Sequence, residues 1–272
     1  MAKTQSPPAS SGAHEPGEGI RLLVAEPDLA GDLDGDALEE AREQAVLPSI
    51  ELDAGDLDLR VLRDAEDLRG RLHGFLVLSG SLMVNLEMSG RTCTRLIGTR
   101  ELVLLDGMQT DSIPVTWHWS VLSPAHLLLF DERLLAISHR WPPLLGKILE
   151  RAAQQTRNAF LQQAISQLPR VEERLLALFW SIADRQGVVR PDGIWVELDA
   201  THDTLAHMVG AQRPTVSLGL TRLTEMGMLQ VETDGWLLAP GSLEAFAGIE
   251  DGEGPAAIAA RSAEEDTAGT AS

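Results

Sequence analysis

The stretch LDATHDTLAHMVGAQRPTVSLGLTRLTEMGMLQVETDGWLL, residues 198–238, decides the fold. Its first half predicts a short helix that Thr201 or Asp203 caps at the N-terminus and Gly210 ends with a sharp turn. The apolar residues of this helix recur at helical spacing, at Leu205, Met208 and Val209. A second helix is predicted to begin directly after the turn, so the pair has the pattern of a helix-turn-helix.

The second helix carries the candidate contact residues. Pro214 fits its first turn, where a missing N–H costs nothing, and a buried face is predicted at Val216, Leu220 and Leu223. The side chains left near the N-terminus are those of Gln212, Arg213, Thr215, Ser217 and Leu218. In a helix-turn-helix such residues face the DNA major groove. We predict a base contact for Arg213, to guanine, with support at base edges or phosphates from Gln212, Thr215 and Ser217, and backbone contacts from Thr201, His202 and Arg222.

Two hairpins flank the helix pair. Residues 228–231 and 236–238 are short apolar runs around an Asp-Gly turn and predict a β-wing. Upstream, 171–186 predicts a helix that ends at Gly187, followed by a hairpin around Pro191-Asp192-Gly193. A three-helix core with a hairpin that binds only protein is the alternative, because this geometry is not unique to DNA-binding proteins.

Composition bounds the possible functions. The chain has 272 residues, of which 44% are hydrophobic, enough for one large or two ordinary domains. It has no run of 18 apolar residues and no secretion signal, so we expect a cytoplasmic protein without a membrane partner. Cys93 is the only cysteine, which excludes intramolecular disulfides, a four-cysteine cluster and cysteine-based zinc sites. No metal site and no cofactor is predicted.

The net charge of −19 opposes non-specific binding to nucleic acid. The charge is uneven, however, because residues 204–224 contain no Asp or Glu and do contain Arg213, Arg222 and His207. We therefore expect few phosphate contacts, with specificity that depends on base contacts and on the spacing of two half-sites.

The N-terminal part has a different pattern. Residues 1–19 and 241–272 predict disordered tails, the second one acidic. Residues 20–141 predict a β-roll domain, with short helical pieces over 20–47 followed by period-two strands. The strands are expected at 75–78, 82–88, 92–97, 101–105, 115–121 and 126–130, with a break at Ser79-Gly80. Such a roll holds a small ligand or is filled by its own side chains, and alternation puts either Trp117 and Trp119 or His118 inside it.

A long helix is predicted over 142–168, after a short helix that Asp131 caps. Its apolar stripe favours a two-fold dimer interface over a simple core helix. The interface is expected at Leu145, Ile148, Leu149, Ala152, Thr156, Ala159 and Phe160. Residues 169–240 complete the chain as a winged helix-turn-helix domain, so the fold class is α+β.

This order of elements, with RVEERLL at 170–176, THDTLA at 201–206 and VGAQRPTV at 209–216, resembles the CRP/FNR family of bacterial transcription regulators. The resemblance implies a cyclic-nucleotide-binding-like β-roll, a dimerisation helix and a winged helix-turn-helix. It also implies a homodimer that binds double-stranded DNA at a palindromic site, with RNA polymerase and an unidentified small-molecule effector as further candidate partners.

Two departures from the family pattern matter. The recognition helix of the family often runs Ser-Arg-Glu-Thr-Val-x-Arg, whereas QRPTVSL at 212–218 has Pro in place of Glu and Leu in place of the second Arg. Cyclic-nucleotide-binding members hold the ligand with a Gly-Glu-Leu turn and a following Arg. Here 98–114 keeps Glu101-Leu102 but has no Arg after Arg100, so we expect that the roll does not bind cyclic nucleotide.

Three other functions compete. A haem sensor would use axial ligands among His73, His118, His126, His139 and Cys93, but no haem-attachment motif is present. A cupin-type enzyme needs closely spaced His and Glu residues that the strands lack, so no catalysis is predicted. A protein-interaction regulator that has lost DNA binding is favoured by the acidic charge and by Leu218.

Overall fold

The computed structural model describes residues 17–65, 67–105, 112–198, 200–233 and 235–242. The chain forms two compact units, with the division between Asn158 and Ala159. The predicted tails at 1–19 and 241–272 lie mostly outside the described residues. The described part of the first one includes the start of a β-strand at Gly17, two residues before the predicted end of the tail. None of the described helices is both long and apolar enough to cross a membrane.

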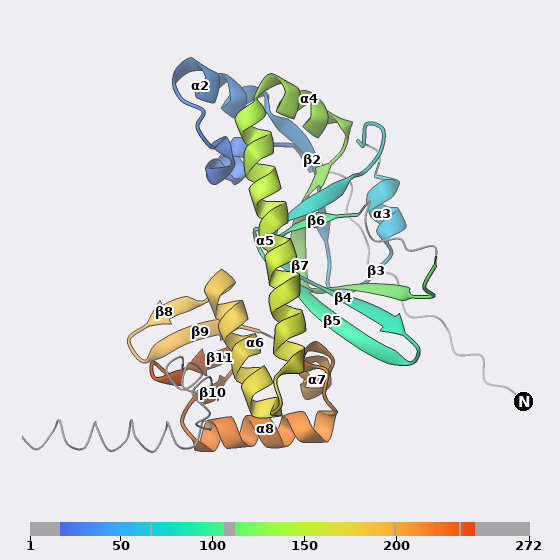
Figure 1. Cartoon of the computed structure of the whole chain (residues 1–272). Coiled ribbons are helices and arrows are strands. Elements are labelled where there is room, and N and C mark those ends of the chain that lie inside the picture. The colour runs from blue at the N-terminus through green and yellow to red at the C-terminus, as the bar shows by residue number, and fades with distance from the viewer. Residues whose placement is uncertain (1–16, 66, 106–111, 199, 234, 243–272) are drawn as a thin grey trace, which may run out of the picture. The chain divides into compact units, whose positions relative to one another are not determined.

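The first unit is built on an antiparallel sheet, as predicted (Figure 1). Its strands are β1 (Gly17–Arg21), β2 (Val46–Leu52), β3 (Gly55–Leu57), β4 (Gly74–Met88), β5 (Arg91–Ile97), β6 (Leu102–Leu104) and β7 (Thr116–Phe130). They pair in the order β1-β2-β7-β4-β5, with β3 on β7 and β6 on β4. The long strands β4 and β7 pair along most of their length and form the central strand pair of the roll.

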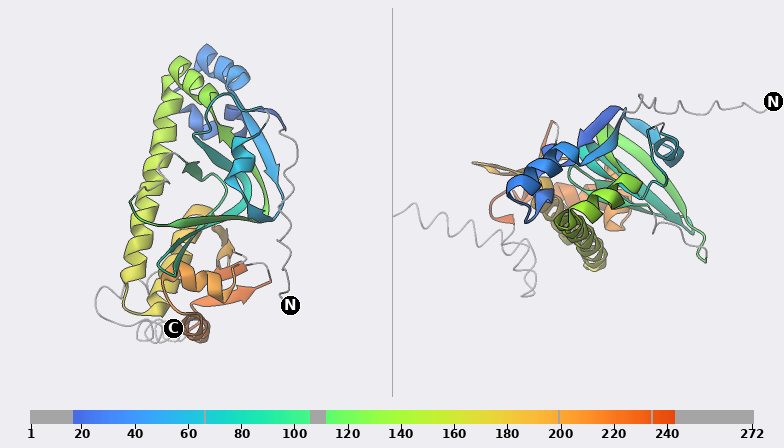
Figure 2. Two further views of the ribbon diagram at one scale, coloured as in Figure 1. Left: turned by 90° about the vertical axis from the view of Figure 1, so that its right-hand side faces the viewer. Right: turned by 90° about the horizontal axis from the view of Figure 1, so that it is seen from above.

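Short helical segments complete this unit. They are α1 (Leu22–Ala25), the 3-10 helix η1 (Pro27–Ala30), α2 (Gly35–Gln44), α3 (Leu59–Arg63) and α4 (Glu132–Arg140), followed by the long helix α5 (Pro142–Gln167), which continues past Asn158 into the second unit. Helices α1, α2 and α4 gather at one end of the roll in each view (Figures 1 and 2). A buried cluster that includes Leu23, Phe130, Trp141 and Leu144 joins these helices, the sheet and the start of α5.

The predicted strand break at Ser79-Gly80 is wrong, because β4 runs through it without interruption. The pairing of β4 with β7 shifts register between Val77 and Leu82, so the site is a β-bulge. Gly80 has a φ of +79°, and a Cβ there would lie 2.2 Å from the backbone O of Pro124 on β7. A glycine is required both by the conformation and by the close approach of the neighbouring strand.

The interior of the roll is filled by its own side chains around the tryptophan pair. Trp119 is 6% exposed in a cluster with Phe75 and Val84, and Trp117 packs against the same cluster. The rings of Phe75 and Trp119 meet edge to face with centroids 6.1 Å apart. His118 points the other way, with a side chain that is 60% exposed. Of the two alternatives left by the alternation of β7, the structure selects the tryptophans.

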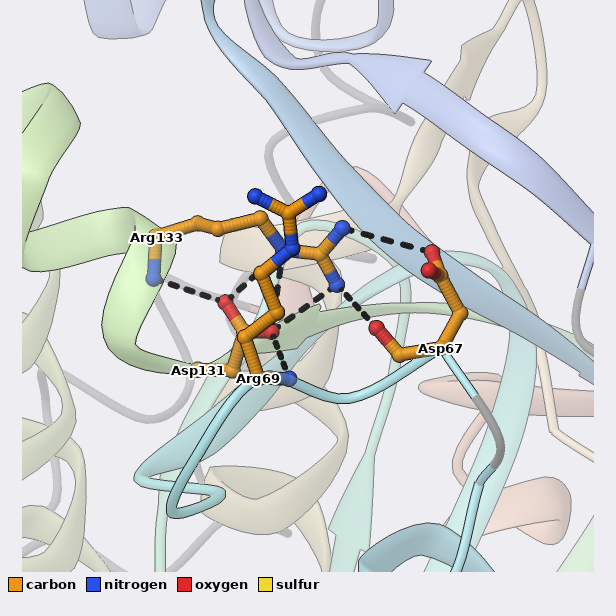
Figure 3. A network of polar contacts seen from close by, with 4 residues as sticks. All are labelled: Asp67, Arg69, Asp131 and Arg133. Carbon is orange, nitrogen blue, oxygen red and sulfur yellow. Dashed lines mark hydrogen bonds and ion pairs between the residues drawn. The ribbon is translucent and has the colours of Figure 1, made fainter.

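A buried carboxylate fixes the start of α4 (Figure 3). Asp131 is the N-cap, as predicted, and its Oδ1 accepts a 2.9 Å hydrogen bond from the Arg133 backbone N–H. Its Oδ2 accepts a 2.8 Å bond from the N–H of Arg69 and forms a 2.8 Å ion pair with the Arg133 guanidinium. Burial acts to raise the pKa of Asp131, but the bonds from Arg133 and Arg69 outweigh it and the pKa is lowered.

After the end of α5, the described part of the second unit contains three helices and a four-stranded sheet. The helices are α6 (Val171–Gln186), α7 (His202–Val209) and α8 (Arg213–Glu225), and the strands are β8 (Val188–Arg190), β9 (Gly193–Glu197), β10 (Leu229–Glu232) and β11 (Gly235–Leu238). The two predicted hairpins are present, and they join into one sheet through antiparallel pairing of β9 with β11. The ring centroids of Phe179 on α6 and Trp236 on β11 lie 4.9 Å apart in the core beneath the sheet.

Candidate nucleic-acid interface

The turn between α7 and α8 is formed as the sequence predicts. The Thr201 hydroxyl caps α7 by accepting a 3.1 Å hydrogen bond from the N–H of Thr204. Gly210 ends the helix in the left-handed conformation, with a φ of +64°. Beyond it, the Ala211 N–H donates to the Ala206 carbonyl over 2.9 Å, which closes the turn before α8 begins.

Two side chains from outside the helix pair hold this turn. Gln162, near the end of α5, donates from Nε2 to the Met208 carbonyl over 2.6 Å. Arg174 on α6 donates to the Val209 carbonyl over 3.3 Å and to the Leu168 carbonyl over 2.6 Å. The bonds to Met208 and Val209 satisfy carbonyls that the end of α7 leaves without a helical partner, and the bond to Leu168 ties Arg174 to the segment after α5. The sequence does not predict this role for either side chain, because no local spacing relates them to α7.

The rotation of α8 about its axis is fixed by its buried face. Val216, Leu220 and Leu223 are buried, as predicted. Gly219 lies on the same face, and a Cβ there would meet the Leu175 side chain of α6 at 3.0 Å. The two helices therefore approach closely at this point. Because this side of α8 packs against the rest of the domain, the opposite side faces outward.

The outward face of α8 includes Gln212, Arg213, Pro214, Thr215, Leu218, Thr221 and Arg222, all exposed, and the exposed Thr224 and Glu225 follow at the end of the helix. Four of the predicted DNA-contacting residues, Gln212, Arg213, Thr215 and Arg222, belong to it. The helix begins at Arg213 without a side-chain cap, so its first N–H groups and the positive end of its dipole lie beside these residues. Among the described residues, no carboxylate forms an ion pair with Arg213.

Two further predicted residues meet at the edge of this face. The Nδ1 atom of His202, the first residue of α7, lies 2.9 Å from the Oγ of Ser217. Ser217 also donates to the Arg213 carbonyl over 3.1 Å. Thr201 precedes His202 and is exposed beside it. The structure thus brings the predicted residues of α7 and those of α8 onto one continuous surface.

Arg222 is engaged within the protein. Its Nη1 lies 2.5 Å from Oε1 of Glu172 in the first turn of α6. Burial acts to raise the pKa of Glu172, but hydrogen bonds from its own backbone N–H and from Arg222 prevail, so the pKa is lowered. The carboxylate therefore stays charged near neutral pH and offsets the charge of Arg222. The sequence does not predict this partner, which lies 50 residues away.

The predicted dimer face of α5 is mostly free. Leu149 is 59% and Phe160 is 68% exposed, and Leu145, Thr156 and Ala159 are exposed as well. Ile148 and Ala152 depart from the prediction. Ile148 is buried in the cluster that joins α1, α2 and α4, and Ala152 packs against that cluster. These two side chains are used inside the protomer, because they fall on the side of α5 that covers the roll.

The segment of the roll that resembles a nucleotide-binding turn is occupied by ion pairs. Arg100 lies 2.6 Å from a carboxylate oxygen of Asp28, and Arg151 of α5 lies 2.6 Å from Glu26 and 2.7 Å from Asp28. Glu101 pairs with Arg95 over 3.1 Å. Residues 106–111 of the compared stretch lie outside the described residues. Within the described part of the chain, no group of three His, Cys, Asp or Glu side chains could hold a metal ion.

Comparison with known proteins adds independent findings. Residues 170–246 match the Crp-like helix-turn-helix domain. No curated protein matches the chain. A solved structure of a CooA mutant from Carboxydothermus hydrogenoformans is similar with a TM-score of 0.51 and 18% identity, over 72% of this chain and 97% of that one. FixK2 from Bradyrhizobium japonicum gives 0.53 and 11%, over 72% and 93%.

A cyclic nucleotide-binding domain containing protein from Listeria monocytogenes EGD-e gives a TM-score of 0.56 at 16% identity, over 70% of this chain and 87% of that one. At these low identities the similarity shows a shared fold alone, and that fold includes both units. The C-terminal unit therefore contains a Crp-like helix-turn-helix domain, and the chain has the architecture of the CRP/FNR family of transcription regulators that its sequence resembles.

Proposed function

We propose that this protein is a sequence-specific, DNA-binding transcription regulator that acts as a homodimer on a palindromic site. The observation that carries the proposal is the outward face of α8 within a domain that matches the Crp-like helix-turn-helix model. In this motif the second helix enters the major groove with its N-terminal residues against base edges. Here those residues are Gln212, Arg213 and Thr215, which supply amide, guanidinium and hydroxyl donors.

Electrostatics sets the character of the interface. The chain carries a formal charge of −19, so its far field repels phosphate. Of the two arginines on the outward face of α8, Arg222 is already paired with Glu172. Phosphate contacts are therefore few, and Arg213 is the principal cation available to DNA. Affinity then depends on base contacts and on the simultaneous use of two half-sites.

The exposed apolar side chains of α5 support the homodimer. Leu145, Leu149, Thr156 and Phe160 recur at spacings of four, seven and four residues, which places them along one side of the helix. Two copies of this stripe can pack about a two-fold axis in the manner of a short coiled coil. A dimer would present two copies of α8, as a palindromic site requires.

The roll is proposed to act without cyclic nucleotide. Arg100 is held by Glu26 and Asp28, and the interior is packed around Trp117 and Trp119. A cyclic nucleotide needs a cation for its phosphate and space for its ribose. The proposal assigns the protein no catalytic step. An unidentified effector of other chemistry and RNA polymerase remain candidate partners, and the expected location is the cytoplasm.

The test is selection of bound sequences from a random duplex pool by the purified full-length protein, with its mass in solution measured at the same concentration. Enrichment of a palindrome by a protein of dimeric mass is the expected result. Failure to enrich any sequence, both alone and with a bacterial extract as a source of effectors, would contradict DNA binding. It would favour the alternative of a regulator that acts through protein contacts.

A further inference from the structure

One large apolar side chain lies in the middle of the outward face of α8. Leu218 is 50% exposed, one turn after Pro214 and one turn before Thr221 and Arg222. It is the only large hydrophobic side chain that α8 exposes. A small rotation of the helix cannot hide it, because Val216 and Leu220 on either side in sequence are fixed in the core.

The neighbours of Leu218 make the surface around it suited to base edges. Arg213 and Thr215 present donors in the preceding turns of the helix, and residues 204–224 include no acid that would repel DNA. Arg222, which follows Leu218 by one turn, is neutralised by Glu172 at 2.5 Å. The centre of this surface is therefore apolar and uncharged, and its cation, Arg213, lies at the N-terminal end of the helix.

Only one group on the major-groove edges of DNA matches this chemistry. Thymine presents a C5-methyl group, whereas the other contacts there are hydrogen-bond donors and acceptors. A leucine pressed against a donor or acceptor would take it out of water without pairing it, which costs free energy. Against a methyl group, the same side chain gains by burying apolar surface on both partners.

We propose that Leu218 recognises the C5-methyl group of a thymine in each half-site, so that the operator is read by an arginine–guanine contact and a leucine–thymine contact. The inference rests on the proposed function and specifies its substrate. Leu218 follows Arg213 by five residues, which at ~1.5 Å per residue is ~7.5 Å along the helix. That length corresponds to about two base-pair steps of ~3.4 Å, so the thymine lies within about two base pairs of the guanine.

The experiment uses the selected operator and the full-length protein. Each thymine is replaced in turn by deoxyuridine, which removes the methyl group and keeps every hydrogen-bonding atom. Burial of one methyl group predicts a loss of about fourfold in affinity at one thymine of each half-site, and about sixteenfold when both half-sites are changed. Other thymines should tolerate the replacement.

Variants assign the effect to the side chain. Leu218→Ala should bind thymine and deoxyuridine duplexes equally, and Leu218→Met should keep the preference for thymine. Val189→Ala is the matched control, because Val189 is an exposed apolar residue of β8, outside the helix pair. It should discriminate like the parent. Unchanged denaturation midpoints would show that the variants are folded.

The outcomes separate the two proposals. If the parent binds the operator but no deoxyuridine replacement weakens binding, or if Leu218→Ala still discriminates, the role of Leu218 is refuted and the regulator function stands. If no duplex is bound specifically by any form of the protein, both proposals fall together.

Discussion

The Oε1 atom of Glu172 lies 2.5 Å from Nη1 of Arg222, and this ion pair joins the first turn of α6 to the last turns of α8. The Arg222 side chain is 55% exposed, so the pair borders the surface proposed to meet DNA. An exposed pair of this kind contributes about 1 kcal/mol or less to folding. Its larger effect is on the charge that this surface offers to phosphate.

Replacing Glu172 by Gln should strengthen DNA binding. The substitution keeps the shape of the side chain and frees the charge of Arg222, so we expect a severalfold gain in affinity at low salt. The slope of log affinity against log salt should steepen by about one unit, as for one added phosphate contact. The matched control is Glu39→Gln, which removes an exposed partner of Arg42 on α2. Equal slopes for the parent and for Glu172→Gln would refute the screening of Arg222.

Arg213→Ala should reduce specific affinity at least tenfold, consistent with the ~1–3 kcal/mol of a bidentate base contact. Discrimination should weaken mainly at one guanine of each half-site. Arg42→Ala removes an exposed arginine from the first unit and should leave binding unchanged. Full affinity in Arg213→Ala, measured by titration of the selected operator, would show that the contact surface lies elsewhere.

If the proposed homodimer forms through α5, Leu149→Glu should convert it to monomers. The leucine is 59% exposed on the predicted dimer face, and a two-fold interface would bury two carboxylates close together. We expect a halved mass in sedimentation equilibrium and a large loss of operator affinity, because one half-site alone binds weakly. Gln154→Glu adds the same charge at another exposed position of α5 and should stay dimeric. A dimeric Leu149→Glu protein would exclude this face.

Gln162→Glu should destabilise the second unit more than Gln162→Ala does. Loss of the 2.6 Å bond to the Met208 carbonyl costs about 1 kcal/mol, whereas a carboxylate there also meets a carbonyl oxygen and the negative end of α7. Denaturant unfolding followed by tryptophan fluorescence would measure the difference. Gln163→Glu, the exposed neighbour, is the control. If both glutamate variants unfold alike, the bond does not hold the turn.

Asp131 should make the first unit sensitive to acid. Its pKa in the folded protein is lowered, so its contribution to the free energy of unfolding is complete above the unfolded value of about 3.9. That contribution is lost as the pH falls through the lower folded pKa. Asp131→Asn should cost on the order of 3 kcal/mol at pH 7, because a helix cap and a buried ion pair are both weakened.

The same variant should also show a flatter dependence of stability on pH below about 4. Asp67→Asn is the matched control, since Asp67 contacts the same Arg133 but its side chain is 48% exposed. It should lose less than about 1 kcal/mol. An Asp131→Asn protein with the parent's acid-unfolding curve would exclude Asp131 as the titrating group.

The helix-turn-helix was predictable because its signals are local. Thr201, Gly210 and the apolar residues between them act within a few positions of the chain, and the structure has the cap, the left-handed turn and the buried face that they indicate. The antiparallel roll was predictable for the same reason, from strict alternation along strands. The break at Ser79-Gly80 was mispredicted because a positive φ serves a turn and a bulge equally well. Only the pairing partner β7 distinguishes the two.

The sequence alone does not show which side chains are paired or buried inside the protein and which stay exposed. Arg222 and Arg213 look alike in the sequence, yet one meets Glu172 from a distant segment and the other has no described carboxylate as a partner. Ile148 and Leu149 both fit an apolar stripe, and packing against the roll buries the first and exposes the second. Packing also determines that Trp117 and Trp119, and not His118, face the interior of the roll.

The sequence by itself determined the type and order of the elements, the turn between α7 and α8 and the kinds of side chain near it, because capping, φ preference and periodicity act over a few residues. The tertiary structure alone decided the partners: Glu172 for Arg222, Gln162 and Arg174 for the end of α7, and β7 for the bulge of β4. Those contacts join segments many residues apart. Their formation depends on how the whole chain packs, which no local pattern records.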